Sequence, residues 1–177
     1  MEKRKKSVCG FLHVYTGDGK GKTTAALGLA LRAAGAGMRT YIGQFLKKGD
    51  FSEIEALKRF PEITVKQFGL GRFVRGKPTE TEIRAAALGL DSIRCAMLSG
   101  YYDLVIADEA NCAVACGLIT IADLLSLARD RPKGVDLLIT GRGTTPSLVR
   151  QADLVSVIRG KKHPFDRGVK ARKGIDC

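Results

Sequence analysis

The 177-residue sequence has no apolar stretch long enough to cross a bilayer, which excludes a helical membrane protein. Its basic first residues, 1–6, are not followed by the apolar core of a signal peptide, so we expect a cytoplasmic protein. Internal repeats and low-complexity tracts are also missing. No Ser/His/Asp or Cys/His arrangement stands out, which leaves no candidate nucleophile–base pair.

The five cysteines do not form a recognisable metal or disulfide pattern. None belongs to a C-x-x-C pair, and Cys112 and Cys116 lack the second pair or the histidines that a zinc site requires. We therefore expect reduced, mostly structural thiols.

Acidic residues are scarce: 18 Asp and Glu face 30 Lys and Arg, for a formal net charge of +12. Such an excess indicates an anionic partner, either nucleic acid or a substrate that bears a triphosphate. The C-terminal basic cluster is interleaved with His163, Pro164, Phe165 and two glycines, so it is expected to be a shaped loop. The basic residues of the two ends are Lys3, Arg4, Lys5 and Lys6, then Arg159, Lys161, Lys162, Arg167, Lys170, Arg172 and Lys173.

The length suits a single α/β domain, residues 1–177, with residues 1–7 as a short basic N-terminal arm. Strand-like and helix-like stretches alternate, which predicts a mostly parallel sheet with helices on both faces. The loops 16–23, 44–50, 69–78, 108–112 and 140–146 all follow strands and should converge on one edge. Expected strands are 8–15, 39–46, 63–68, 103–107, 135–140 and 154–158; expected helices are 25–36, 52–60, 79–99, 120–130 and one from Ser147.

The segment 15–24, Y-T-G-D-G-K-G-K-T-T, is the most informative part of the chain. It lies between a strand and a helix, as a phosphate-binding P-loop does. Glycines let backbone N–H groups turn toward a phosphate, Lys22 adds a positive charge, and Thr23 offers a hydroxyl to Mg²⁺. Thr16 stands where the usual pattern begins with glycine. The expected nucleotide-binding residues are Gly17, Asp18, Gly19, Lys20, Gly21, Lys22, Thr23 and Thr24.

A second signature is the apolar strand 103–107, which ends in Asp108 and Glu109. An acidic group at this place approaches the Mg²⁺ of a P-loop enzyme, so Thr23, Asp108 and Glu109 are the candidate metal residues. The alternative for the acidic pair is that it only caps the following turn. Glu109 either binds metal, as in a transferase, or positions a water, as in a hydrolase. Arg142 follows the next buried strand and is either a charge-neutralising catalytic residue or a surface turn arginine.

Two further loops are candidates. Gln44, Lys47 and Lys48 follow the second strand and either contact phosphate or are only solvated. The 69–78 loop is long for a strand–helix connection, as binding loops often are, and its Phe73 either packs in the core or touches a ligand.

With these motifs assembled, the chain resembles the P-loop type of ATP:corrinoid adenosyltransferase from about Gly10 to its end. The resemblance rests on an ordered set of motifs, and Thr16 in place of the leading glycine also matches the family. The motifs are T-G-D-G-K-G-K-T-T-A-A-L-G at 16–28, G-Q-F-L-K at 43–47, G-L-G-R-F at 69–73, D-E-A-N at 108–111, I-T-G-R at 139–142 and K-H-P-F-D-R-G-V-K-A-R-K-G-I-D at 162–176.

The resemblance implies a RecA-like α/β fold, usually dimeric, in which the Co(I) of a reduced corrinoid attacks the 5′ carbon of ATP and expels triphosphate. It implies that the P-loop binds the triphosphate, that Thr23 and Glu109 serve Mg²⁺, and that Asn111 lies close to the nucleotide. Lys22, Glu109 and Arg142 are then the expected catalytic residues. The 69–75 loop, with Gly71, Arg72 and Phe73, is expected to cover the corrinoid. Expected partners are ATP, the corrinoid and a reductant such as a flavodoxin, with no nucleic acid.

Two features depart from some relatives. This chain has no tryptophan, so Phe73 is the only aromatic residue in the expected corrinoid loop. Only residues 1–7 precede the first strand, whereas some relatives have a longer N-terminal helix over the corrinoid. The alternative functions are a nucleic-acid-associated RecA-like ATPase and a small-molecule kinase, which would release ADP rather than triphosphate.

Overall fold

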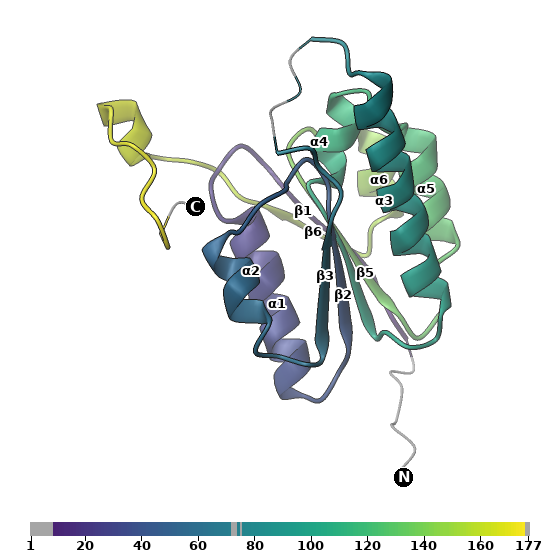
Figure 1. Ribbon diagram of the computed structural model, residues 1–177. Helices are drawn as coiled ribbons and strands as arrows, with labels where there is room; N and C mark the ends of the chain where they lie inside the picture. Colours follow the sequence, from purple (N-terminus) through teal and green to yellow (C-terminus); the bar gives the residue numbers. More distant parts are fainter. Residues whose placement is uncertain (1–8, 72–73, 75, 176–177) are drawn as a thin grey trace.

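The computed structural model describes residues 9–71, 74 and 76–175 of the chain. In this part of the chain, six parallel strands form one sheet in the order β3-β2-β4-β5-β1-β6 (Figure 1). The predicted α/β class with a parallel sheet is confirmed. The strands are β1 (Leu12–Thr16), β2 (Thr40–Gln44), β3 (Ile63–Gln67), β4 (Leu104–Asp108), β5 (Asp136–Thr140) and β6 (Leu154–Val157).

Helices cover both faces of the sheet, and each face has its own hydrophobic core. Successive strand residues point to opposite faces, so Val105 packs in one core and Ile106 in the other. On one face lie α1 (Lys22–Gly35) and α2 (Ser52–Leu57); on the other lie α3 (Glu80–Leu98), α4 (Ala110–Ala115), α5 (Ile121–Arg129) and α6 (Pro146–Gln151).

Local capping signals fix the starts of two helices where the sequence predicts them. Thr79 caps α3: its hydroxyl accepts from the Glu82 N–H, and the Glu82 carboxylate accepts from the Thr79 N–H. Thr120 and Asp123 form the same capping box at α5. Each box satisfies N–H groups that the first helical turn leaves without a partner.

Two helix starts differ from the prediction. Helix α1 begins at Lys22 rather than near Ala25, because Gly21 takes a left-handed conformation at φ 117° and turns the chain directly into the helix. The prediction of a loop over residues 108–112 was wrong, because helix α4 begins at Ala110. Its N-cap residue, Glu109, has a φ of 60°, which reverses the chain immediately after β4.

The described residues of all five candidate segments lie at the carboxyl edge of the sheet, as predicted, because parallel strands all end at the same edge. Beyond β6 the chain continues past this edge to a short 3₁₀ helix, η1 (Pro164–Arg167), which lies apart from the helical layers (Figure 1). The expected N-terminal arm lies outside the described residues. Among the helices described, none is long and apolar enough to span a bilayer.

Candidate active site

The P-loop turns through close backbone packing that requires glycine. The Gly19 N–H donates to the Ile158 carbonyl at 2.9 Å, just after β6. A Cβ on Gly17, whose φ is 102°, would lie 2.2 Å from that same carbonyl oxygen. The loop can therefore follow its path between β1 and α1 only if these positions carry no side chain.

Lys22 is buried under this loop. Its Nζ donates to the Gly17 carbonyl at 2.8 Å and to the Gly19 carbonyl at 2.7 Å. Burial and the positive charge of Arg142 lower the pKa of Lys22 from its ordinary value, and the carboxylate of Glu109 opposes this effect. The ammonium group is thus held within the loop that would receive a phosphate.

Asp108, at the end of β4, is the centre of a buried polar network. One carboxylate oxygen accepts from the Thr140 hydroxyl at 2.8 Å and from the Thr23 hydroxyl at 3.0 Å. The other accepts from Gln44 Nε2 at 3.0 Å and from Lys47 Nζ at 3.2 Å. The carboxylate is fully buried with a donor on each side, so its position is fixed before any ligand binds.

The strand order explains why this network forms. Gln67, Gln44 and Asp108 are in register on β3, β2 and β4, and the Gln67 amide donates to the Gln44 side-chain oxygen at 3.1 Å. Strand β5 lies between β4 and the P-loop strand, and its Thr140 bridges that gap to Asp108. Four strand ends therefore form a continuous hydrogen-bonded row at the carboxyl edge.

Glu109 and Arg142 meet around Cys112 at the start of α4. The Cys112 thiol donates to the Glu109 carboxylate, and its sulfur accepts from the Arg142 N–H at 3.2 Å. Burial, followed by the Glu109 hydrogen bond and charge, raises the pKa of Cys112 to about 12. The thiol stays protonated at neutral pH, so it joins the two loops and is not a nucleophile.

Asn111 supports the Arg142 loop. Its side-chain amide donates to the Thr144 hydroxyl at 2.6 Å and to the Gly141 carbonyl at 3.5 Å, and the residue is buried. A nucleotide contact by Asn111 stays a prediction, because Asn111 does not line the cavity described next.

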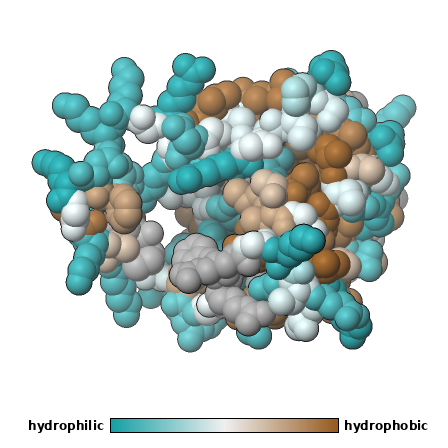
Figure 2. Space-filling model, turned by 90° about the horizontal axis from the view of Figure 1, so that it is seen from above, coloured by the Kyte–Doolittle hydropathy of each residue, from teal (hydrophilic) through white to brown (hydrophobic). Residues whose placement is uncertain are grey.

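A cavity of about 860 Å³ opens between the P-loop, α1, α2 and the C-terminal segment, which we define as residues 162–175. In Figure 2 this segment lies at the left, mostly hydrophilic, and an open hollow separates it from the body. Near the P-loop, the cavity is lined by both carboxylate and cationic side chains. It is lined by Gly19, Lys20, Gly21, Lys22, Thr23, Thr24, Leu27, Gly28, Leu31, Lys47, Ser52, Glu53, Ala56, Glu109, Arg142, His163, Pro164, Phe165, Val169, Lys170, Ala171, Gly174 and Ile175.

The structure brings together most of the residues predicted from the sequence. All three expected catalytic residues, Lys22, Glu109 and Arg142, line this cavity, as do residues 19–24 of the P-loop. Gly17 and Asp18 do not line it, although Gly17 accepts the Lys22 hydrogen bond. Arg72 and Phe73 of the expected corrinoid loop lie outside the described residues. Gly71 has a φ of 74° and lies beside Lys48, away from the cavity.

For several residues, the sequence did not predict the part that they play in the site. Thr140 directly precedes the G-R pair, yet nothing local indicates that its hydroxyl donates to the carboxylate of Asp108 in the preceding motif. The sequence left open whether Lys47 contacts phosphate or is only solvated; in the structure it forms an ion pair with Asp108. The K-H-P-F motif was part of the family resemblance but received no role; His163, Pro164 and Phe165 line the cavity.

The residues present fit a magnesium ion that arrives with a nucleotide. Over the described chain, no group of three or more His, Cys, Asp or Glu could hold a metal by itself. Magnesium typically takes only one or two carboxylates and completes its shell with water and substrate phosphate. The Thr23 hydroxyl and the Asp108 carboxylate are hydrogen-bonded to each other, and one cationic group, Lys47 Nζ, already lies within 3.1 Å of the Thr23 hydroxyl.

Comparison with known proteins decides the family. The sequence model of the ATP:corrinoid adenosyltransferase family BtuR/CobO/CobP matches residues 9–177. The chain belongs to this family. Similar curated proteins are the corrinoid adenosyltransferase CobA of Salmonella typhimurium, 36% identical over 94% of this chain and 85% of the relative, and the corrinoid adenosyltransferase of Pseudomonas aeruginosa, 32% identical over 94% and 83%. That of Escherichia coli is 33% identical over 94% and 85%.

Among solved structures, a KaiC-like protein from Pyrococcus horikoshii aligns with a TM-score of 0.53 over 85% of this chain and 72% of that one. At 16% identity, this likeness concerns the fold alone. It agrees with the RecA-like P-loop fold expected from the sequence.

Proposed function

We propose that this protein transfers the 5′-deoxyadenosyl group of ATP to the Co(I) centre of a corrinoid and releases inorganic triphosphate. The observation that carries the proposal is the meeting of Lys22, Thr23 and Arg142 in one cavity of a chain that matches the adenosyltransferase family over residues 9–177. The nucleic-acid-associated ATPase is not favoured, because the matching family and its curated members are corrinoid adenosyltransferases.

The P-loop side of the cavity is suited to hold the leaving group. Triphosphate leaves with several negative charges, and their stabilisation in the transition state lowers the barrier. Lys22 would exchange its two loop carbonyls for phosphate oxygens, and the exposed Arg142 side chain can approach from the opposite loop. The N–H groups at the start of α1 add a partial positive charge.

Thr23, Asp108 and Glu109 are the proposed magnesium residues: Thr23 and Glu109 line the cavity, and the buried Asp108 accepts a hydrogen bond from Thr23. When bound, the ion would neutralise phosphate charge. Asp108 cannot move far, since four side chains donate to it. We therefore propose that Asp108 orients the Thr23 hydroxyl. Glu109 is proposed to lie nearer to the nucleotide.

The chemical step needs no protein nucleophile. The electron pair of Co(I) forms the cobalt–carbon bond as the bond between the 5′ carbon and its oxygen breaks, and that oxygen leaves with the triphosphate. Neither atom gains or loses a proton in this step, so no general base is required. What the protein supplies is alignment of the two substrates and a place for the leaving charge. The protonated Cys112 is compatible with this role, since it only joins the Glu109 and Arg142 loops.

The remaining features are predictions of the proposal. The 69–75 loop covers the corrinoid, with Gly71, Arg72 and Phe73 as its contacts. The enzyme works in the cytoplasm as a homodimer and receives an electron from a reductant such as a flavodoxin. Asn111 acts through the Arg142 loop that it supports.

The test is an anaerobic mixture of the protein, MgATP and a chemically reduced corrinoid. The visible spectrum should change to that of an alkylcobalt product while triphosphate accumulates in equal amount. Appearance of ADP without a cobalt–carbon product would instead support a kinase or ATPase.

A further inference from the structure

The Lys47 ammonium group contacts two of the proposed magnesium residues, Thr23 and Asp108. Its Nζ lies 3.1 Å from the Thr23 hydroxyl and 3.2 Å from an Asp108 carboxylate oxygen. The Asp108 side chain is almost fully buried, while that of Lys47 is 23% exposed and lines the cavity. A single positive charge thus neutralises a buried carboxylate from the solvent side.

The backbone that presents Lys47 is unusual. The Lys47 N–H donates to the Phe45 carbonyl at 2.7 Å, which closes a three-residue turn around Leu46. Leu46 has a φ of 62°. Such a turn with positive φ is rare and strained for a residue with a side chain. Leu46 and Glu109 are the two non-glycine residues with positive φ in the described chain, and they flank the same carboxylate.

Surrounding contacts hold this strained turn in place. The Phe45 N–H donates to the Asp108 carbonyl at 3.0 Å, and the Gly69 N–H donates to the Lys47 carbonyl at 3.0 Å. A Cβ on Gly69 would lie 2.3 Å from the Leu46 backbone, so the two loops pack directly on each other. Strain that the surroundings maintain in this way is typical of functional sites.

We propose that Lys47 is a positioning residue that takes the place of a cation between Thr23 and Asp108 in the nucleotide-free enzyme. When a magnesium–nucleotide complex binds, the ammonium group moves from Asp108 to the incoming phosphate oxygens. Lys47 and Lys22 line the same cavity, so both side chains border the space proposed for the triphosphate. This inference rests on the proposed function, since it assumes that magnesium enters with ATP.

The arrangement has two consequences. A free divalent cation is repelled by the ammonium group, so the site should bind metal weakly in the absence of nucleotide. The carboxylate is never left buried without a positive partner, a state that is costly in a protein interior. Lys47 therefore couples metal entry to nucleotide entry.

The experiment measures Mn²⁺ binding to the nucleotide-free protein by electron paramagnetic resonance, with the neutral variants Lys47→Met and Lys47→Gln. Removal of the competing charge should tighten Mn²⁺ binding by about tenfold or more. Lys47→Arg retains the charge and should bind Mn²⁺ as weakly as the wild type. Lys66→Met is the matched control, since Lys66 is exposed on the neighbouring β3 and loses the same charge.

Equal Mn²⁺ affinity in the wild type, both neutral variants and Lys66→Met would overturn the proposal. Thermal melting of each variant identifies any that is unfolded. If Lys47→Met does not fold, Lys47→Gln still tests the proposal, because its amide can donate a hydrogen bond to Asp108. A purely structural role for Lys47 predicts a lower melting temperature with unchanged Mn²⁺ affinity. In the same titration, wild-type protein with ATP should bind Mn²⁺ tightly. Failure of that arm alone would contradict the magnesium site of the proposed function rather than the role of Lys47.

Discussion

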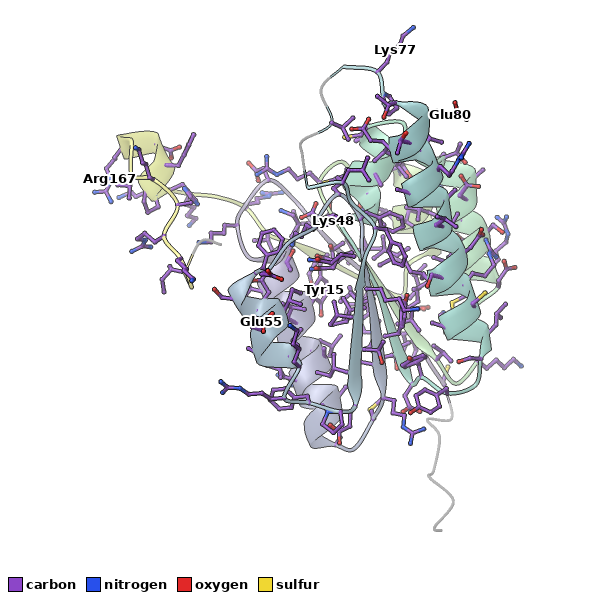
Figure 3. The ribbon with its side chains drawn as sticks, viewed as in Figure 1. Tyr15, Lys48, Glu55, Lys77, Glu80 and Arg167 are labelled. Atoms are coloured by element: carbon purple, nitrogen blue, oxygen red, sulfur yellow. The ribbon has the colours of Figure 1, made fainter. Side chains whose placement is uncertain are left out.

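The two walls of the cavity are built in opposite ways. On one wall, Lys22 is bonded to two loop carbonyls, and behind this wall Asp108 is fully buried and receives hydrogen bonds from four side chains. On the other, the C-terminal segment is mostly exposed, with Phe165 at 74% and Ile175 at 64%. Figure 3 shows Arg167 on that segment, well away from the sheet, whereas Lys48 lies close to the strand ends.

The difference indicates that the two walls act on different parts of the reaction. The phosphate wall is arranged before substrate binds, which is what stabilisation of a leaving charge requires. The C-terminal wall offers exposed apolar side chains, and a hydrogen bond of 2.8 Å from Lys20 Nζ to the Ile175 carbonyl connects it to the P-loop. We expect bound substrate to cover these exposed apolar side chains.

The largest effect is expected on the phosphate wall. Lys22→Ala removes the charge that would face the leaving triphosphate and should lower the rate of adenosyl transfer by about 10²-fold or more. Single-turnover spectroscopy at saturating MgATP measures this loss. Lys66→Ala, which removes an exposed lysine outside the cavity, should retain the wild-type rate. An unchanged rate in Lys22→Ala would remove Lys22 from the mechanism.

The second effect concerns the rigidity of the same wall. Asp108→Asn places an amide NH₂ among hydroxyl, amide and ammonium donors, so one buried donor loses its partner. The free energy of unfolding should fall by about 1–3 kcal/mol, measured by urea denaturation. Asp91→Asn, the same substitution at an exposed position on α3, should change it by less than about 0.5 kcal/mol. Equal effects would contradict the view that Asp108 organises this edge.

Local signals were enough to predict part of this architecture. Thr79 and Glu82 specify the start of α3 through a capping box that involves only neighbouring residues. The P-loop was equally clear, since its glycines and Lys22 lie within ten residues. In contrast, α4 has six residues and begins after Glu109 without a side-chain cap, so no helix signal precedes it.

The contacts of the site could not be predicted for a different reason. The hydrogen bonds from Lys47 and Thr140 to Asp108 depend on the strand order, which places β2 and β5 on either side of β4. The strand order is decided by the packing of the whole sheet, so it cannot be predicted from any single motif. The position of Phe165 against the cavity is likewise set by the path of the chain after β6, which has few local determinants.

On the C-terminal wall, Phe165→Ala should act on substrate binding alone. Loss of this exposed apolar side chain is expected to raise the KM for ATP or for the corrinoid by about three- to tenfold. The free energy of unfolding should stay within about 0.5 kcal/mol of the wild type, because Phe165 has little packing to lose. Leu88→Ala, which removes an exposed apolar side chain from α3, serves as the control in steady-state kinetics. A destabilised Phe165→Ala would show that this wall is packed in the absence of substrate.

The smallest effect lies away from the carboxyl edge. Burial alone would raise the pKa of Asp136, but hydrogen bonds from His13 Nε2 and the Phe11 N–H, with the charge of Arg131, hold that pKa below its ordinary value. A lowered carboxyl pKa contributes stability that is fully present above the ordinary value of about 3.9 and is lost as the pH falls through the folded value. Urea denaturation between about pH 5 and pH 3 should therefore show a smaller loss of stability in Asp136→Asn than in the wild type. Identical pH profiles would contradict this assignment, and adenosyl transfer at neutral pH should not change.

The central claim is that the P-loop holds the part of ATP that leaves while the new bond forms at the other end. An anaerobic single turnover tests it with ATP that has a heavy carbon isotope at the 5′ position and heavy oxygen in the bridge to the first phosphate. The heavy carbon should be bonded to cobalt, and the heavy oxygen should be found entirely in intact triphosphate. Heavy oxygen that remains with adenosine, or its recovery in ADP, would contradict the account.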